Sequence, residues 1–272
     1  MAYDTANKNC PGLPQELVDT IIDHLHDDPT ALKQCALVSK RTFLPGCRWR
    51  LFSTFEISNK NYHKIVEHYN PTSEGPLPVP AEECVLNTYT TILTFSGCWN
   101  SYFEEKNVPK FPKVQRILFK GGMLTSDTLP HPPWGGFFGE VRNVELNFVT
   151  TMDSDELILA TLCELPERVE NIRFTSKKTL RQSSPAALDL LCDKIRVEFN
   201  PPRLIGTLGL NLHDHNGCNL LKALINLGDV FSAKGLSYRL SPDGVDGPLI
   251  QSLVEKYEDL ECLRVVNPPK CA

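Results

Sequence analysis

A chain of 272 residues with 41% hydrophobic and 22% charged residues can bury a core, so it is not disordered as a whole. Its net charge of −5 at pH 7 and its lack of a long Lys/Arg run argue against binding to nucleic acid through the phosphates. No stretch approaches the roughly 20 consecutive apolar residues of a membrane span, so we expect no membrane partner.

Three short helical patterns occupy residues 11–55, after a polar segment of ten residues that we expect to be mobile. The first pattern is amphipathic, since Leu13, Leu17 and Ile21 recur every four residues. Helices of about ten residues are marginal alone, and a bundle of about forty residues buries little surface. We therefore expect its surplus of apolar surface to be covered by a partner, by the rest of the chain or by both.

The second and third patterns have recognisable start signals. Asp28 before Pro29 predicts a helix that begins there and continues to about residue 38, apolar on nearly every side. A helix of that kind has to be covered all round. Ser39 is placed to cap a third element, which we expect Pro45 to interrupt before the helical pattern continues.

Residues 56–87 are expected to form a linker that contains a helix and a proline-rich loop. The loop, residues 71–83, has four prolines and no apolar periodicity, which is typical of a semi-rigid connection. The remaining residues, 88–272, are long enough for one larger domain.

Short segments with alternating apolar residues recur through this larger domain, and each is typical of a half-buried strand. We expect strands at residues 93–95, 117–119, 144–148, 172–174, 195–199, 208–212, 236–238 and 263–265. Start signals between them predict helices at residues 157–165, 186–191 and 249–257. Gly235 is expected to end a further helix over residues 218–233.

The first residues of the expected strands recur at intervals of 24, 27 and 28, and again at 28 and 27 for the last two. A strand-plus-helix unit of about 20–29 residues is typical of leucine-rich repeats, which stack into a curved solenoid. The repeat consensus is filled in order by Cys192, Ile195, Val197 and Asn200. The strand expected there breaks the interval, so it either belongs to the repeat or forms a hairpin. A generic α/β domain is the alternative.

Residues 13–52 resemble an F-box, and residues 88–266 resemble leucine-rich-repeat recognition domains more loosely. The first resemblance rests on Leu13-Pro14, Glu16-Leu17, Ile21-Ile22, Leu25, Leu32, the run from Ala36 to Lys40, and the fungal-type ending Phe43-Leu44-Pro45 through Arg50-Leu51-Phe52. Together the two resemblances imply an α/β protein: an N-terminal three-helix F-box followed by an irregular leucine-rich-repeat-like solenoid.

The F-box family implies that the chain is a substrate-recognition adaptor and not an enzyme. An F-box docks on the Skp adaptor of an SCF-type, cullin-based ubiquitin ligase, and the repeat domain would present a target protein, with no cofactor. Helix-in-groove packing suits the apolar faces of these helices. The side chains implied in the Skp contact are Leu13, Pro14, Leu17, Val18, Ile21, Ile22, Leu25, Leu37, Val38, Phe43 and Leu44.

Two alternatives differ from this interpretation. The N-terminal helices would merely cap a repeat scaffold, in which case Leu13, Pro14, Leu17 and Ile21 would be buried. An enzyme is the competing class, but the sequence contains no Gly-x-Ser-x-Gly, Gly-x-x-x-x-Gly-Lys or His-Glu-x-x-His motif.

The best candidate for a metal site is His213-Asp214-His215 with Cys218 nearby. A closed zinc site needs four ligands and no second pair stands out, so a polar loop is favoured. The ten cysteines follow irregular spacings without a Cys-x-x-Cys pair, and the first residues lack the apolar core of a signal peptide. We therefore expect reduced thiols and a cytoplasmic or nuclear protein.

Overall fold

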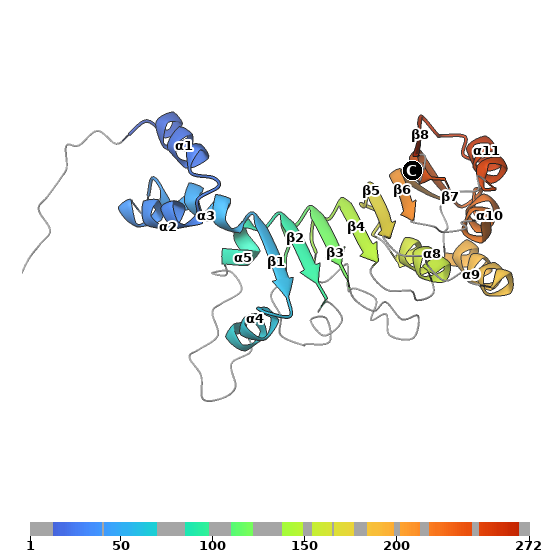
Figure 1. Ribbon diagram of the computed structural model, residues 1–272, viewed down its shortest axis with the longest axis horizontal. Helices are drawn as coiled ribbons and strands as arrows, with labels where there is room; N and C mark the ends of the chain where they lie inside the picture. The colour runs from blue at the N-terminus through green and yellow to red at the C-terminus, as the bar shows by residue number, and fades with distance from the viewer. Residues whose placement is uncertain are drawn as a thin grey trace, which may run out of the picture. The chain divides into compact units, whose positions relative to one another are not determined.

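The computed structural model describes residues 13–39, 41–69, 85–97, 110–121, 138–148, 154–164, 166–176, 184–198, 202–212, 218–240 and 245–266. The chain divides into two compact units, with the boundary between Thr54 and Phe55 (Figure 1). Residues 1–10 and 71–83, expected to be mobile and loop-like, lie outside the described residues.

Three helices form the first unit: α1 (Gln15–His24), α2 (Pro29–Val38) and α3 (Leu44–Phe52). Asp28 caps α2 as expected, because its carboxylate accepts the backbone N–H groups of Thr30 and Ala31 at 2.9 and 3.0 Å. The interruption expected at Pro45 is wrong. Pro45 lies in the first turn of α3, where a missing N–H costs no intrahelical hydrogen bond.

Ser39 caps the turn before α3 and not α3 itself. Its hydroxyl accepts the backbone N–H of Thr42 at 3.1 Å, whereas the N-cap residue of α3 is Phe43, which makes no side-chain cap. The three helices share one small core. Its buried side chains are Val18, Ile22, Leu32, Phe43 and Cys47.

The second unit is an α/β domain built on an open parallel sheet. Its strands follow sequence order, so each strand lies beside the next one in the chain, and every recorded register from β2 to β8 is parallel. The eight strands among the described residues are β1 (Thr54–Ser58), β2 (Ile92–Ser96), β3 (Arg116–Lys120), β4 (Asn143–Phe148), β5 (Asn171–Ser176), β6 (Arg203–Leu212), β7 (Phe231–Arg239) and β8 (Cys262–Val266).

The connections between strands carry the helices of this unit. They are α4 (Tyr62–Tyr69), α5 (Val85–Tyr89), α8 (Ser154–Glu164), α9 (Pro185–Glu198), α10 (Cys218–Asn226) and α11 (Gly247–Lys256). Helices α8 to α11 lie on one side of strands β5 to β8 (Figure 1). A parallel sheet needs a crossover between each pair of strands, and crossovers on one side leave the other face of the sheet open.

The same three positions recur with every strand from β2 to β8; all three are apolar from β3 to β8, whereas the first position of β2 is the buried Thr90. In β3 and the residues before it they are Val114, Ile117 and Phe119, spaced three and then two residues apart and all buried. The stacked rings of Phe95 and Phe119, 5.5 Å apart at 11°, show the repetition directly. The equivalent triplets are 90-93-95, 141-144-146, 169-172-174, 205-208-210, 233-236-238 and 260-263-265.

The strand expected at residues 195–199 is wrong, and α9 occupies this part of the chain to Glu198. Ile195 is buried while Val197 is 83% exposed, so their alternation does not mark a sheet face. The buried residues of α9 are Leu188, Cys192 and Ile195, at the i, i+4, i+7 spacing of a helix.

Helix α9 also explains the break in the interval. Register partners are 24 residues apart between β2 and β3 and 28 apart between β4 and β5, but Asn171 of β5 pairs with Thr207 of β6, 36 residues later. The chain therefore makes one long crossover here, and not a hairpin.

Two further expectations differ from the structure. Helix α10 ends at Asn226, and Gly235 lies inside β7 instead of ending that helix. A Cβ at Gly235 would lie 3.2 Å from the side chain of Thr207, so glycine allows β6 and β7 to lie close together at this position. β1 and α4 fall within or beside the expected linker, and Ile57 and Tyr62 join the large core of the second unit.

Two buried tyrosines provide a matched test of this core. The hydroxyl of Tyr257 has no hydrogen-bond partner among the described residues, whereas that of Tyr238 donates to buried Asp246. We expect Tyr257→Phe to leave the free energy of unfolding unchanged or to raise it by up to about 1 kcal/mol, and Tyr238→Phe to lower it by about 1–3 kcal/mol. Urea denaturation measures both, and equal destabilisation would contradict the assignment.

The stability of the protein at alkaline pH should depend on Tyr257. Burial raises the pKa of Tyr257 above its usual value, so the unfolded chain releases this proton first, near pH 10. Stability is therefore retained below about pH 10 and falls as the pH rises further. We expect a shallower alkaline decline for Tyr257→Phe than for the wild type, measured by denaturation at pH 8 to 11.

Candidate protein-docking site

The first unit exposes a row of apolar side chains along α1. Leu13, Leu17 and Ile21 have exposed fractions of 51%, 52% and 38%. Leu17 and Ile21 lie one turn apart on α1, and Leu13 lies just before its first turn. The neighbouring row, Val18 and Ile22, is buried in the core of the unit. The apolar stripe of α1 is thus divided between this core and solvent.

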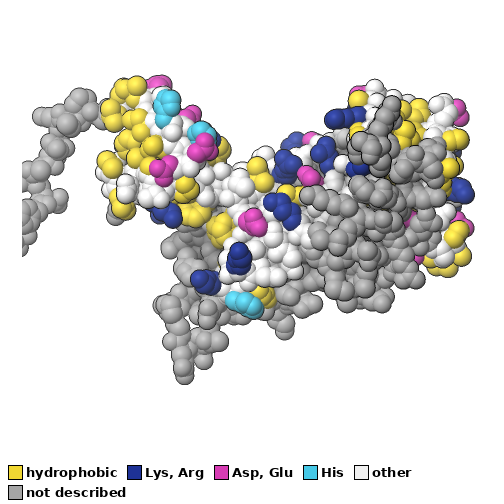
Figure 2. Space-filling model, viewed as in Figure 1, with side chains coloured by type: hydrophobic (Ala, Val, Ile, Leu, Met, Phe, Trp, Pro, Cys, Tyr) yellow, Lys and Arg dark blue, Asp and Glu magenta, His cyan; other side chains and the backbone are white. Residues whose placement is uncertain are grey.

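The second helix adds the most exposed apolar side chains of the unit. Leu37 and Val38 are 86% and 74% exposed, and Leu32 is the buried residue of α2. The sequence predicts that α2 is buried on every side, whereas in the structure only one side of α2 packs against the core of the first unit. Figure 2 shows hydrophobic side chains gathered over this unit in the face that the view presents.

The residues expected to contact a partner separate into three groups. Six are exposed: Leu13, Pro14, Leu17, Ile21, Leu37 and Val38. Two are partly buried, Leu25 and Leu44. Three are core residues: Val18, Ile22 and Phe43, with exposed fractions of 0%, 2% and 8%. A direct contact is therefore restricted to the exposed group, while the core residues hold the helices that carry it.

Sequence reasoning missed Trp49 of α3, which is 45% exposed and stacks under the guanidinium of Arg50 at 4.7 Å. Arg50 also forms an ion pair with Asp23 of α1. Glu16 and Asp19 add exposed carboxylates to α1. Apolar side chains with a polar rim are typical of a surface that another protein covers.

Two kinds of catalytic group can be considered in the described residues, a metal site and a reactive thiol. They contain no group of three or more His, Cys, Asp or Glu side chains placed to hold a metal ion. The candidate triplet His213-Asp214-His215 lies outside the described residues, and Cys218 forms no disulfide with a described residue. Burial raises the pKa of the thiols of Cys47 and Cys192, which keeps both protonated at neutral pH.

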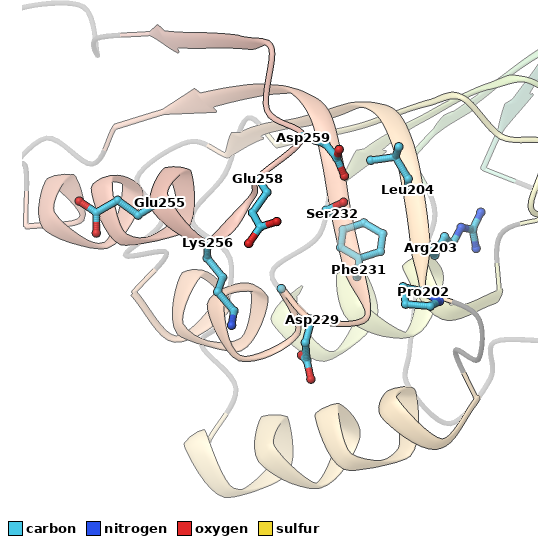
Figure 3. Close-up of a pocket in the computed structure, with 11 residues that line it drawn as sticks. Pro202, Arg203, Leu204, Asp229, Phe231, Ser232, Glu255, Lys256, Glu258 and Asp259 are labelled. Atoms are coloured by element: carbon cyan, nitrogen blue, oxygen red, sulfur yellow. The ribbon is translucent and has the colours of Figure 1, made fainter.

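One cleft of about 450 Å³ lies where β6 and β7 begin, beside the end of α11. Figure 3 shows Glu255 pointing away from the other labelled side chains, on the outer side of α11. The aliphatic part of the Lys256 side chain packs against Gly228. A Cβ added to Gly228 would lie 2.4 Å from Cγ of Lys256. The described residues of the lining include acidic and basic side chains but neither histidine nor cysteine.

A second cleft, of about 390 Å³, lies on the open face of the sheet across β3 to β7. Its floor is polar, with an ion pair between Arg116 and Glu145 at 3.1 Å and a hydrogen bond from the amide of Asn171 to that of Asn143 at 2.8 Å. Side chains from strands far apart in sequence meet here because the register aligns them.

No helix in the described part of the chain is both long enough and apolar enough to cross a membrane. No protein-family model, curated protein or solved structure matches the chain. Its function is therefore argued from its own sequence and geometry.

The division of the helical unit into core and surface has a direct test. Leu32→Ala should lower the stability of the unit by about 2–5 kcal/mol, because it opens a cavity in a small core. Leu37→Ala should change it by less than about 0.5 kcal/mol. Hydrogen exchange of the amides of α2 in the full chain measures this unit separately from the sheet. Equal loss of protection in the two variants would show that Leu37 is not a surface residue.

Proposed function

We propose that the chain is an F-box-type adaptor of a ubiquitin ligase. The first unit docks on a Skp adaptor of a cullin-based ligase, and the second unit holds a target protein. The observation that carries the proposal is the exposure of Leu13, Leu17 and Ile21 in a unit whose sequence order resembles an F-box. The chain brings a target close to the transferring enzyme and takes no part in the chemistry itself.

Docking is supported by the energetics of the exposed side chains. Burying a fully exposed Leu, Val or Ile side chain is worth about 1.5–3 kcal/mol, and roughly half of that for a half-exposed one. Pro14, with φ −52°, is already fixed in conformation and loses little entropy on contact. Within the first unit itself Leu13, Pro14, Leu17 and Ile21 are all exposed, so no part of this unit covers them.

The proposal assigns the second unit to an irregular leucine-rich-repeat-like solenoid. Three features support it: parallel strands in sequence order, an apolar triplet at the same positions from β3 to β8, and register steps of 24 to 28 residues. Each repeat covers the apolar face of its neighbour, which is how such solenoids are stabilised. The departure is the 36-residue step that contains α9. Such an adaptor acts in the cytoplasm or nucleus, where the ligase is found.

A binding measurement with purified Skp adaptor tests the proposal. Leu17→Asp combined with Ile21→Asp should weaken adaptor binding at least tenfold, because two charges are placed in an apolar contact. Leu190→Asp is the matched control, since Leu190 of α9 is 75% exposed on the other unit and should leave binding unchanged. Failure of the wild-type chain to bind, or equal binding by the double variant, would refute the proposal.

A further inference from the structure

Alternate residues of the strands form an open face of the sheet, opposite the apolar triplets. Leu118 of β3, Glu145 of β4, Arg173 of β5, Gly209 of β6 and Ser237 of β7 lie in one row across it, because their strands pair in this register. Arg264 of β8 extends the same row. Register therefore decides which charged residues share the face.

The open face is basic although the whole chain is acidic. From β3 to β8 its described residues include one carboxylate, Glu145, and five cations. The cations are Arg116, Lys120, Arg173, Arg239 and Arg264. Figure 2 shows Lys and Arg side chains gathered over the strands of the sheet. Against a net charge of −5, this local excess of positive charge marks a surface suited to an anionic ligand.

Most of these cations pair with no other described residue. Arg116 pairs with Glu145, whose side chain is 20% exposed. The side chains of the other four make no hydrogen bond or ion pair with the described residues. Elsewhere in the unit an arginine does form an ion pair, since Arg142 lies 2.8 Å from Glu170.

Gly209 shapes the floor of the cleft on this face. A Cβ at Gly209 would lie 3.1 Å from Cγ of Arg173, so glycine lets the arginine side chain lie close over the neighbouring strand. Arg173, Gly209 and Ser237 all line the 390 Å³ cleft. Arginine suits this position because its planar fork binds a carboxylate through two hydrogen bonds.

The face favours a peptide over a nucleic acid. Among its described residues from β2 to β8 there is no aromatic side chain on which a base could stack. It carries asparagines instead, Asn143, Asn147, Asn171 and Asn211, whose amides can donate to and accept from a peptide backbone.

The spacing of the cations sets the form of the ligand. They lie on β3, β5, β7 and β8, and adjacent strands are about 4.8 Å apart, so the steps from β3 to β5 and from β5 to β7 are about 10 Å each, and the step from β7 to β8 is about 5 Å. An extended peptide advances about 3.3 Å per residue. Acidic residues about three positions apart, on a segment running across the strands, would therefore meet the cations of β3, β5 and β7 in turn.

We propose that the open face binds an extended acidic segment of the target protein, with Arg173 and Arg264 as its principal anion contacts. This inference rests on the proposed function in that it names the class of target that the adaptor presents. Covering the face with such a segment also gives partners to the four cations that have none among the described residues.

Fluorescence anisotropy with the full chain tests the proposal. The probe is a labelled twelve-residue peptide with Asp at every third position, and its partner carries Asn at the same positions. At about 50 mM salt the Asp peptide should bind at least tenfold more tightly than the Asn peptide, and the difference should shrink at about 500 mM salt because charges are screened. Equal binding of the two peptides would overturn the proposal.

Variants assign the binding to this face. Arg173→Gln with Arg264→Gln should weaken binding of the Asp peptide at least fivefold, whereas Lys113→Gln with Lys222→Gln, which remove exposed cations from a turn and from α10, should not. Unchanged binding by the arginine variant would overturn the assignment. Tighter binding of a single-stranded oligonucleotide, or of vesicles containing phosphatidylserine, would also overturn the choice of a peptide.

The same variants separate this inference from the adaptor proposal. The Arg173 and Arg264 variant should bind purified Skp adaptor like the wild type, and the Leu17 and Ile21 variant should bind the Asp peptide like the wild type. Loss of peptide selectivity with adaptor binding intact would refute this inference alone. Peptide selectivity without adaptor binding would refute the adaptor proposal alone.

Discussion

Each strand-containing segment of the second unit has an apolar face that its neighbours in the sheet have to cover. Ile117 and Phe119 are buried because β2 and β4 lie beside β3 with the same apolar positions in register. Removing one segment would expose the apolar faces of two others. This mutual dependence orders the strands as they occur in the sequence, and the parallel direction then requires a crossover after every strand.

The same constraint separates the two faces of the sheet. Period-two alternation sends one set of side chains into the core and the other set to the open face. Burial favours apolar residues in the first set, as the stacked Phe95 and Phe119 illustrate. The second set has no such limit and can carry charge without loss of the fold.

The first unit is limited instead by its small size, which restricts how much apolar surface it can bury. A core of five buried side chains leaves much of its apolar surface uncovered, including Leu17, Ile21 and Leu37. A docking module has a use for this surplus, since the same helices that form the small core present the exposed row. Buried Val18 and Ile22 position α1, and the proposed contact is made by the side chains one residue away from them.

The sequence by itself determined where the strands β2 to β5 and β8 lie, the later parts of β6 and β7, the three N-terminal helices, and the cap at Asp28, because periodicity and capping are local properties. It did not distinguish α9 from a strand, since Ile195 and Val197 alternate over too short a run to separate a period of 2 from one of 3.6. Tertiary structure alone decided which row of α1 is core and which is surface, because an apolar pattern marks a face without saying what covers it. It also decided that Arg173 and Arg264, on strands three apart in the sheet, share a row, since register between parallel strands depends on packing along the whole sheet.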